Sequence, residues 1–76
     1  MNDITHTQVR ILQYLEYIKQ LTQELHIVRT DLSNCVSDIV YEELIDLQIT
    51  LSTQLTKAEA QLTQYRTLLV HLQGLY

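Results

Sequence analysis

The sequence predicts an all-α protein, an antiparallel two-helix hairpin, on three observations. Proline is absent and glycine occurs once, at Gly74, so neither helix breaker interrupts the chain before its last residues. Apolar residues recur with a heptad period in both halves, and the two periodic stripes are out of frame with each other. We therefore expect helices at about 5–33 and about 39–73, within one domain spanning residues 1–76.

The first helix is predicted from two rows of residues that each repeat every seven positions. Nine of the ten residues in these rows are apolar, and Thr7 is the exception. Such a stripe, with a mean spacing of 3.5 residues, is typical of a helix that packs along another helix in coiled-coil fashion. The first row is Ile4, Ile11, Ile18, Leu25 and Leu32, and the second is Thr7, Tyr14, Leu21, Val28 and Cys35.

The second helix repeats the pattern in its own frame, with ten of eleven stripe positions apolar. Its rows are Tyr41, Gln48, Leu55, Leu62, Leu69 and Tyr76, and Leu44, Leu51, Ala58, Tyr65 and Leu72. Continuing the first frame would instead place its stripe at Ile39 and Asp46. The break falls within the polar segment 33–38, and a short polar break between two helices favours an antiparallel hairpin.

The helix ends are predicted from residues that commonly terminate helices. Asn34 is expected to end the first helix in a left-handed conformation, and Ser37 or Asp38 to cap the second. Gly74 is expected just past the second helix, with Leu75 folding back on the last turn. The residues that could cap the start of the first helix are Asp3, Thr5 and Thr7.

Composition excludes several classes of function. A net charge of −4 with five dispersed basic residues argues against nucleic-acid binding, which needs clustered Lys and Arg. No apolar run approaches the roughly 20 residues of a membrane span. The N-terminal residues lack a basic region followed by an apolar stretch, so we expect no secretory signal and a cytoplasmic location. The basic residues are Arg10, Lys19, Arg29, Lys57 and Arg66.

Catalytic and cofactor chemistry find no support in the sequence, and we expect no enzyme, no cofactor and no metal. His6 and His71 would approach each other in a hairpin, but two histidines without a third ligand make a poor metal site. Cys35 has no basic neighbour in sequence and is expected to act as a small apolar residue. A single glycine cannot form a phosphate-binding loop.

Apolar residues outside the stripes indicate a protein-binding surface. A hairpin has one seam, so we expect Leu12, Leu15, Leu47 and Leu68 to contact a partner. We expect the same of Tyr41, which begins the second stripe among the acidic residues. Scattered surface apolar residues are the alternative. The uncharged polar stretch 47–56 suits burial against protein or reflects composition alone. Likewise, the acidic residues of 38–46 either attract a basic partner or complement the helix dipole.

The layout resembles a known family. The start of the second helix, with Tyr41, Leu44, Leu51 and Leu55, is similar to the aromatic residue and following apolar residues of the YscE/EscE/SsaE-type co-chaperones of bacterial type III secretion. The resemblance covers most of the chain in layout and about 20 residues in pattern. It implies a chain that stabilises a tetratricopeptide-like chaperone, which together with it holds the needle subunit soluble before export.

Two other interpretations remain open. The chain has the pattern of a structural subunit in a multi-chain coiled-coil scaffold, and, more remotely, the size of a small helical enzyme. A core in this size range supplies only ~3–5 kcal/mol, so the isolated chain is expected to form a homodimer or larger oligomer, or to be weakly stable.

Overall fold

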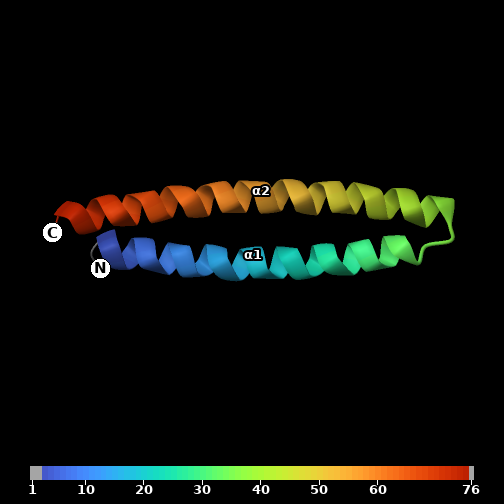
Figure 1. Ribbon diagram of the computed structural model, residues 1–76, viewed down its shortest axis with the longest axis horizontal. Coiled ribbons are helices and arrows are strands. Elements are labelled where there is room, and N and C mark those ends of the chain that lie inside the picture. Colours follow the sequence, from blue (N-terminus) through green and yellow to red (C-terminus); the bar gives the residue numbers. More distant parts are fainter. Residues whose placement is uncertain (1–2, 76) are drawn as a thin grey trace.

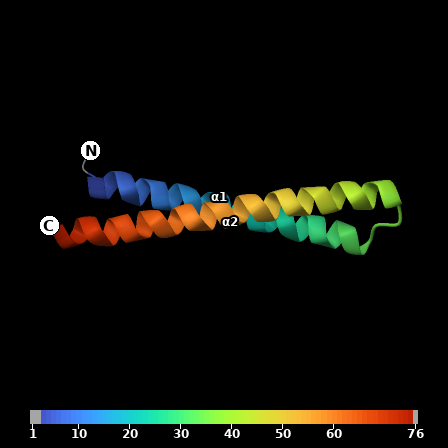
Figure 2. The ribbon, with the colours of Figure 1, turned by 90° about the horizontal axis from the view of Figure 1, so that it is seen from above.

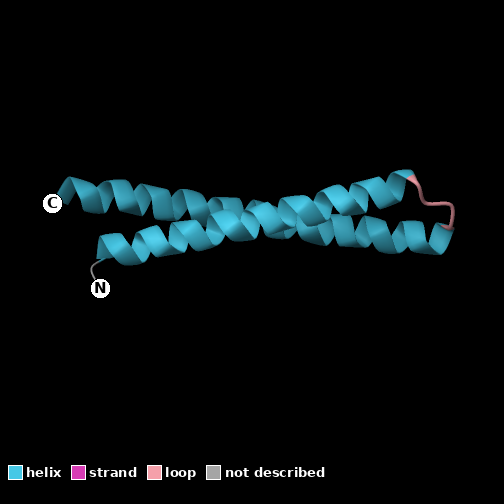
Figure 3. Ribbon diagram, turned by 90° about the horizontal axis from the view of Figure 1, so that it is seen from below, coloured by secondary structure: helices cyan, strands magenta, loops and turns pink. Residues whose placement is uncertain are grey.

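The protein is a hairpin of two long helices. The computed structural model describes residues 3–75, with side chains up to residue 74. Helix α1 spans Asp3–Ser33 and helix α2 spans Asp38–Leu75, and they run antiparallel side by side, with both ends of the chain at one end of the body (Figure 1). The body measures 58 × 16 × 14 Å along its principal axes, and the helices cross at a shallow angle near their middle (Figures 2 and 3). The predicted all-α hairpin is confirmed.

The core is the single seam between the helices, and the two heptad stripes form it. On α1, every position of the predicted stripe is buried or half-buried, and Leu25 is the most enclosed, at 3% exposure. On α2 the stripe is likewise enclosed from Leu44 to Leu72, whereas Tyr41 is 49% exposed. Tyr76 lies outside the described residues. The buried residues of the seam are Thr7, Leu21, Leu25, Val28, Leu51, Ala58 and Leu62.

The register of the seam follows from an aromatic pair. The rings of Tyr14 and Tyr65 pack with their centroids 5.6 Å apart. One heptad further toward the turn on each helix, Leu21 faces Ala58, and both belong to the central hydrophobic cluster. Because Ala58 is small and Leu21 is large, the two helices can approach closely where this pair meets.

Among the described residues, Thr7 is the one buried polar residue of the seam, at 3% exposure. Its hydroxyl donates a hydrogen bond of 2.7 Å to the backbone carbonyl of Asp3, one turn earlier. A buried hydroxyl destabilises a fold when it lacks a partner, and this one has its partner within its own helix. Threonine therefore occupies an apolar position with its polar group satisfied.

The turn between the helices differs from its predicted form. No described residue other than glycine has a positive φ, so the expectation of a left-handed Asn34 is wrong. Instead, the Asn34 backbone amide donates to the Asp31 carbonyl at 3.2 Å, and its side-chain amide donates to the Thr30 carbonyl at 3.1 Å. These bonds satisfy carbonyls at the end of α1, which a left-handed residue would otherwise help to satisfy.

The start of α2 agrees with the prediction. The Tyr41 amide donates to the Ser37 carbonyl at 2.9 Å, which makes Ser37 the residue that precedes the first turn of α2. The thiol of Cys35 donates to the same carbonyl at 3.3 Å. Cys35 thus lies in the turn, and its thiol links the turn to the residue that precedes α2.

Both helices begin and end within two residues of the predicted bounds, but two further assignments of end residues are wrong. Helix α1 already begins at Asp3, so Thr5 and Thr7 lie inside it and cannot be its caps. Helix α2 continues through Gly74, which has no positive φ, to Leu75. Glycine permits the left-handed conformation without requiring it, and the helical one keeps the hydrogen bonding of the last turn. The predicted contact of the Leu75 side chain lies outside the described residues.

The seam accounts for the stability of the hairpin, so truncating it should unfold the protein. We expect Leu25→Ala to cost ~2–4 kcal/mol, since it opens a cavity at the centre of a small core. Urea unfolding followed by circular dichroism measures this loss. Leu12→Ala is the control, because Leu12 is 66% exposed and its truncation should change stability by less than ~0.5 kcal/mol. Equal losses in the two variants would contradict the seam.

The helical conformation of Gly74 gives a second prediction. A Cβ added at Gly74 meets no atom within 4 Å. Gly74→Ala should therefore raise the stability by up to ~1 kcal/mol, as alanine replaces glycine in a helix. Thermal unfolding measures the change as a rise in Tm. A fall in Tm would instead show a left-handed residue at this position.

Candidate protein-binding surfaces

The side chains outside the seam form two opposite faces and a tip. One face holds the residues that come one or four positions after each member of the Ile4 row of α1 and of the Tyr41 row of α2. The other face holds the residues that come three positions after, or one position before, each member of the Thr7 row of α1 and of the Leu44 row of α2. We call these the Leu12 face and the Tyr17 face. The tip comprises the exposed apolar residues at the turn, Val36, Ile39, Val40 and Tyr41.

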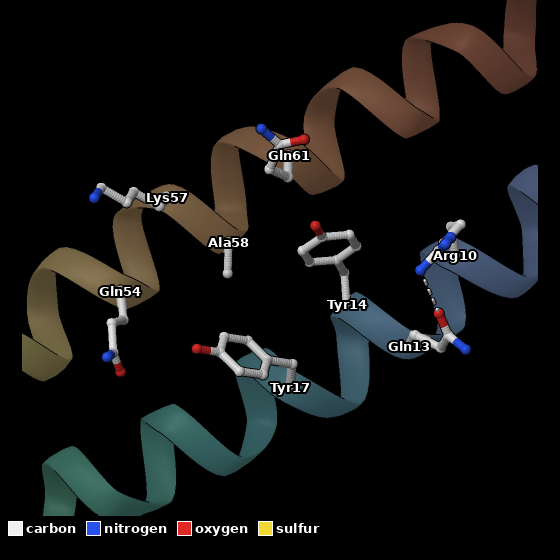
Figure 4. A pocket seen from close by; sticks show the side chains of 8 residues that line it. All are labelled: Arg10, Gln13, Tyr14, Tyr17, Gln54, Lys57, Ala58 and Gln61. Carbon is white, nitrogen blue, oxygen red and sulfur yellow. Dashed lines mark hydrogen bonds between the residues drawn. The ribbon is translucent and has the colours of Figure 1, made fainter.

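A shallow groove of about 430 Å³ lies in the middle of the Tyr17 face. The methyl group of Ala58 forms its floor, and the rings of Tyr14 and Tyr17 flank this group (Figure 4). Ala58 is 4% exposed, whereas Tyr17 is 43% exposed and available to a partner. The polar rim consists of Arg10 and Gln13 of α1, joined by a 3.4 Å hydrogen bond, and Gln54, Lys57 and Gln61 of α2.

Apolar residues continue the Tyr17 face on both sides of the groove. Near the chain ends, Leu68 lines a smaller pocket of about 170 Å³ together with His6. Three heptads toward the turn on each helix, Ile27 and Leu47 occupy the positions equivalent to His6 and Leu68. All three apolar side chains are at least 42% exposed. The Tyr17 face therefore carries apolar side chains at both ends and an aromatic groove at its centre.

The Leu12 face has its apolar residues in two separate groups. Leu12 and Leu15 are 66% and 40% exposed and lie one turn apart on α1. On α2, Ile49 near the turn and Val70 near the C-terminal end are 60% and 70% exposed. Polar residues separate the two ends of this face, about half of them threonine or serine and the others including Lys19 and Glu59.

The five residues predicted from the sequence to bind a partner are all exposed, but they do not form one site. Leu12 and Leu15 lie together on the Leu12 face. Leu47 and Leu68 lie on the Tyr17 face, separated by three heptads, or ~30 Å along the helix. Tyr41 belongs to the tip. A partner that contacts all five would have to wrap around the hairpin.

The sequence analysis missed the tip residues Val36, Ile39 and Val40. Val36 is fully exposed, and Ile39 is 72% exposed. A signal was present in the three consecutive apolar residues 39–41. Successive helical residues point about 100° apart, so at most one of the three can enter a narrow seam.

Serine and threonine hydroxyls on the outer surface are already hydrogen-bonded within their own helices. Each donates to the backbone carbonyl four residues earlier, at 2.8 to 3.1 Å. A hydroxyl with an internal partner loses less when water is removed, so these polar surfaces are easier to bury than charged ones. The residues are Thr22, Thr30, Ser33, Thr50, Thr53, Thr56, Thr63 and Thr67.

The net charge is concentrated at the turn end of the hairpin. Residues 29–46 contain five acidic residues and one basic residue, which gives −4. The rest of the chain contains four acidic and four basic residues, which cancel. The turn end is therefore acidic and the opposite end is close to neutral. The five acidic residues at the turn end are Asp31, Asp38, Glu42, Glu43 and Asp46.

The described residues provide no metal-binding cluster, because no three His, Cys, Asp or Glu side chains among them are placed to hold an ion. Within the same residues, neither helix is long and apolar enough to cross a bilayer. No protein-family model, characterised protein or solved structure matches the chain.

Proposed function

We propose that the protein is a helical binding module, without enzymatic activity, that packs its outer apolar side chains against partner helices. The observation that carries this proposal is the number of large apolar side chains left exposed once the hairpin has formed. They lie on both faces, at the tip and, in the case of Val9, on the outer side of α1: Val9, Leu12, Leu15, Tyr17, Ile27, Val36, Ile39, Val40, Tyr41, Leu47, Ile49, Leu68 and Val70.

The free energy available from this surface is substantial for so small a chain. Burying a Leu, Ile or Val side chain contributes about 1.5–3 kcal/mol. Leu12 and Leu15 are 66% and 40% exposed, so covering them contributes ~1.5–3 kcal/mol, a large fraction of the ~3–5 kcal/mol that a small core supplies. A partner that covers these residues would stabilise the fold by mass action as well as bind it.

The partner we propose is a tetratricopeptide-like chaperone of bacterial type III secretion, in the cytoplasm. The basis is the resemblance of the segment that starts at Tyr41 to the YscE/EscE/SsaE-type co-chaperones. Helical-repeat proteins present long concave surfaces, which suit a rod with outward apolar side chains. The complex would keep the needle subunit soluble by covering its self-associating helix.

A second candidate is a structural subunit of a multi-chain coiled-coil scaffold. The observation that favours it is that apolar residues lie on two opposite faces, so helices of several chains can pack around this hairpin. Neighbouring genes separate the candidates, because type III secretion genes beside this one would favour the co-chaperone.

The bench test is co-expression with a tetratricopeptide-like protein from the same source. We expect a stable complex, and we expect the variant Leu12→Asp/Leu15→Asp to weaken it at least tenfold, since each new charge must be desolvated or left unpaired on binding. The control Gln23→Asp/Thr30→Asp adds the same charge on the outer side of α1 and should bind normally.

Two outcomes would count against these proposals. A wild-type chain that forms no complex and is monomeric and well folded on its own would contradict the co-chaperone proposal. Circular dichroism supplies the second check. The Leu12→Asp/Leu15→Asp variant should keep its helicity, whereas Leu51→Asp/Leu55→Asp should lose it, and equal losses would contradict separate seam and partner surfaces.

A further inference from the structure

We propose that two copies of the chain pack head to tail through their Tyr17 faces and form an antiparallel four-helix dimer. This inference does not rest on the proposed function, because it uses Tyr17, Leu47, Leu68 and the charges around them rather than Leu12 and Leu15. It identifies the occupant of the Tyr17 face as a second copy of the same chain.

The first argument is the charge on this face. Its turn half carries three acidic residues, Glu24, Asp31 and Glu43. Its other half carries one basic residue, Arg10, and one acidic residue, Asp3, together with His6 and His71, and Lys57 lies at the middle. The face is therefore acidic at one end and close to neutral at the other, so turning one copy end over end separates the two acidic halves and sets each beside the half that carries Arg10.

The second argument is that the charges lie at matching distances from the centre. A two-fold axis that crosses the face near Gln20, close to the middle of the hairpin, sets α1 of one copy against α1 of the other. Arg10 and Asp31 lie on opposite sides of Gln20, each ~15 Å from it along the helix. Arg10 of one protomer therefore comes level with Asp31 of its partner, and symmetry forms this pair twice.

The third argument is that the apolar residues match about the same axis. The seam register places this axis near Lys57 and Ala58 on α2. Leu47 and Leu68 lie on either side of that level, each ~16 Å away. Leu47 of one protomer therefore packs near Leu68 of its partner, at both ends of the interface. At the centre, Tyr17 of each protomer lies within ~5 Å of the axis level, beside the groove around Ala58.

Lys57 is the charged residue of the face that comes level with its own copy. Its side chain points away from the groove (Figure 4), so the two ammonium groups can extend to solvent while their stems cover the interface. A parallel arrangement has its two-fold axis along the rod and sets α1 against α2 of the partner, so Arg10 comes level with the Leu68 region and Asp31 with the Leu47 region. The Arg10–Asp31 pairs therefore form only in the head-to-tail orientation.

The face is also large enough for a stable dimer. The hairpin is 58 Å long and 16 Å wide, so one of its faces has an area on the order of 900 Å². Specific interfaces bury ~800 Å² per partner. The rim of Gln13, Gln54 and Gln61 around an apolar centre is the usual composition of such an interface.

The test is the self-association of the full chain, measured by sedimentation equilibrium at low salt. We expect a dimer. Arg10→Asp and Asp31→Arg should each raise the dimer Kd at least tenfold, because each places like charges together twice. The double variant Arg10→Asp/Asp31→Arg restores opposite charges and should return the Kd to within about threefold of wild type. Arg29→Asp, on the Leu12 face, is the control and should leave it unchanged.

Cross-linking locates the face independently, in a Cys35→Ser background. Gln20→Cys lies beside the axis and should give cross-linked dimers with a short bismaleimide, whereas its neighbour Lys19→Cys lies on the Leu12 face and should not. A monomer at all concentrations, single variants with the wild-type Kd, or a double variant that does not recover would overturn the proposal. Cross-linking of Lys19→Cys alone would do so as well. None of these variants alters Leu12 or Leu15, so failure of the dimer proposal leaves the test of the partner complex unaffected.

Discussion

The packing of two helices along one seam is the constraint on which the rest of this molecule depends. Each helix can present only its heptad stripe to the other, and the pairs Tyr14–Tyr65 and Leu21–Ala58 fix how the stripes meet. A third helix or a sheet would cover other faces, but the hairpin has neither within the described residues. Every side chain outside the stripes is therefore left at the surface, whatever its polarity, and the outer surfaces are a direct consequence of the small core.

Those outer surfaces combine exposed apolar residues with polar residues that are easy to dehydrate. Leu12, Ile49 and Val70 gain free energy when they are covered. Threonines such as Thr56 and Thr63 lose little, because their hydroxyls are bonded to the carbonyls of their own helix. Charged residues would oppose burial more strongly, and they are concentrated at the turn end. The rest of the rod is thus better suited than the turn end to lie against another helix.

The sequence predicted the seam well because heptad spacing is a geometric property of two packed helices, independent of what else surrounds them. It predicted the helix ends less well. Asn34 and Gly74 can each adopt a left-handed conformation. Local hydrogen bonds decide which conformation each residue takes, and the residue types do not reveal these bonds. Tyr41 continues the stripe yet is exposed, because α2 starts beyond the end of α1 and has no opposing turn. The exposure of Leu12 and Leu47 was predictable from their positions outside the stripes. Their separation onto opposite faces follows from their heptad positions once the helices run antiparallel, whereas the levels at which they lie along the rod required the register.

The two faces set limits on what the molecule can do at one time. Leu47 and Leu68 cannot contact a second copy and another protein simultaneously, whereas Leu12 and Leu15 stay accessible in the head-to-tail dimer. A partner that binds only the Leu12 face would bind the dimer, and it would find two equivalent sites on opposite sides of it. A partner that also needs Leu47 or Leu68 would have to displace the second copy, and its apparent affinity would fall as the concentration of the chain rises. The dependence of partner binding on chain concentration therefore distinguishes two cases. In one, the dimer binds a partner at each of its two Leu12 faces; in the other, the dimer must dissociate before a partner can bind.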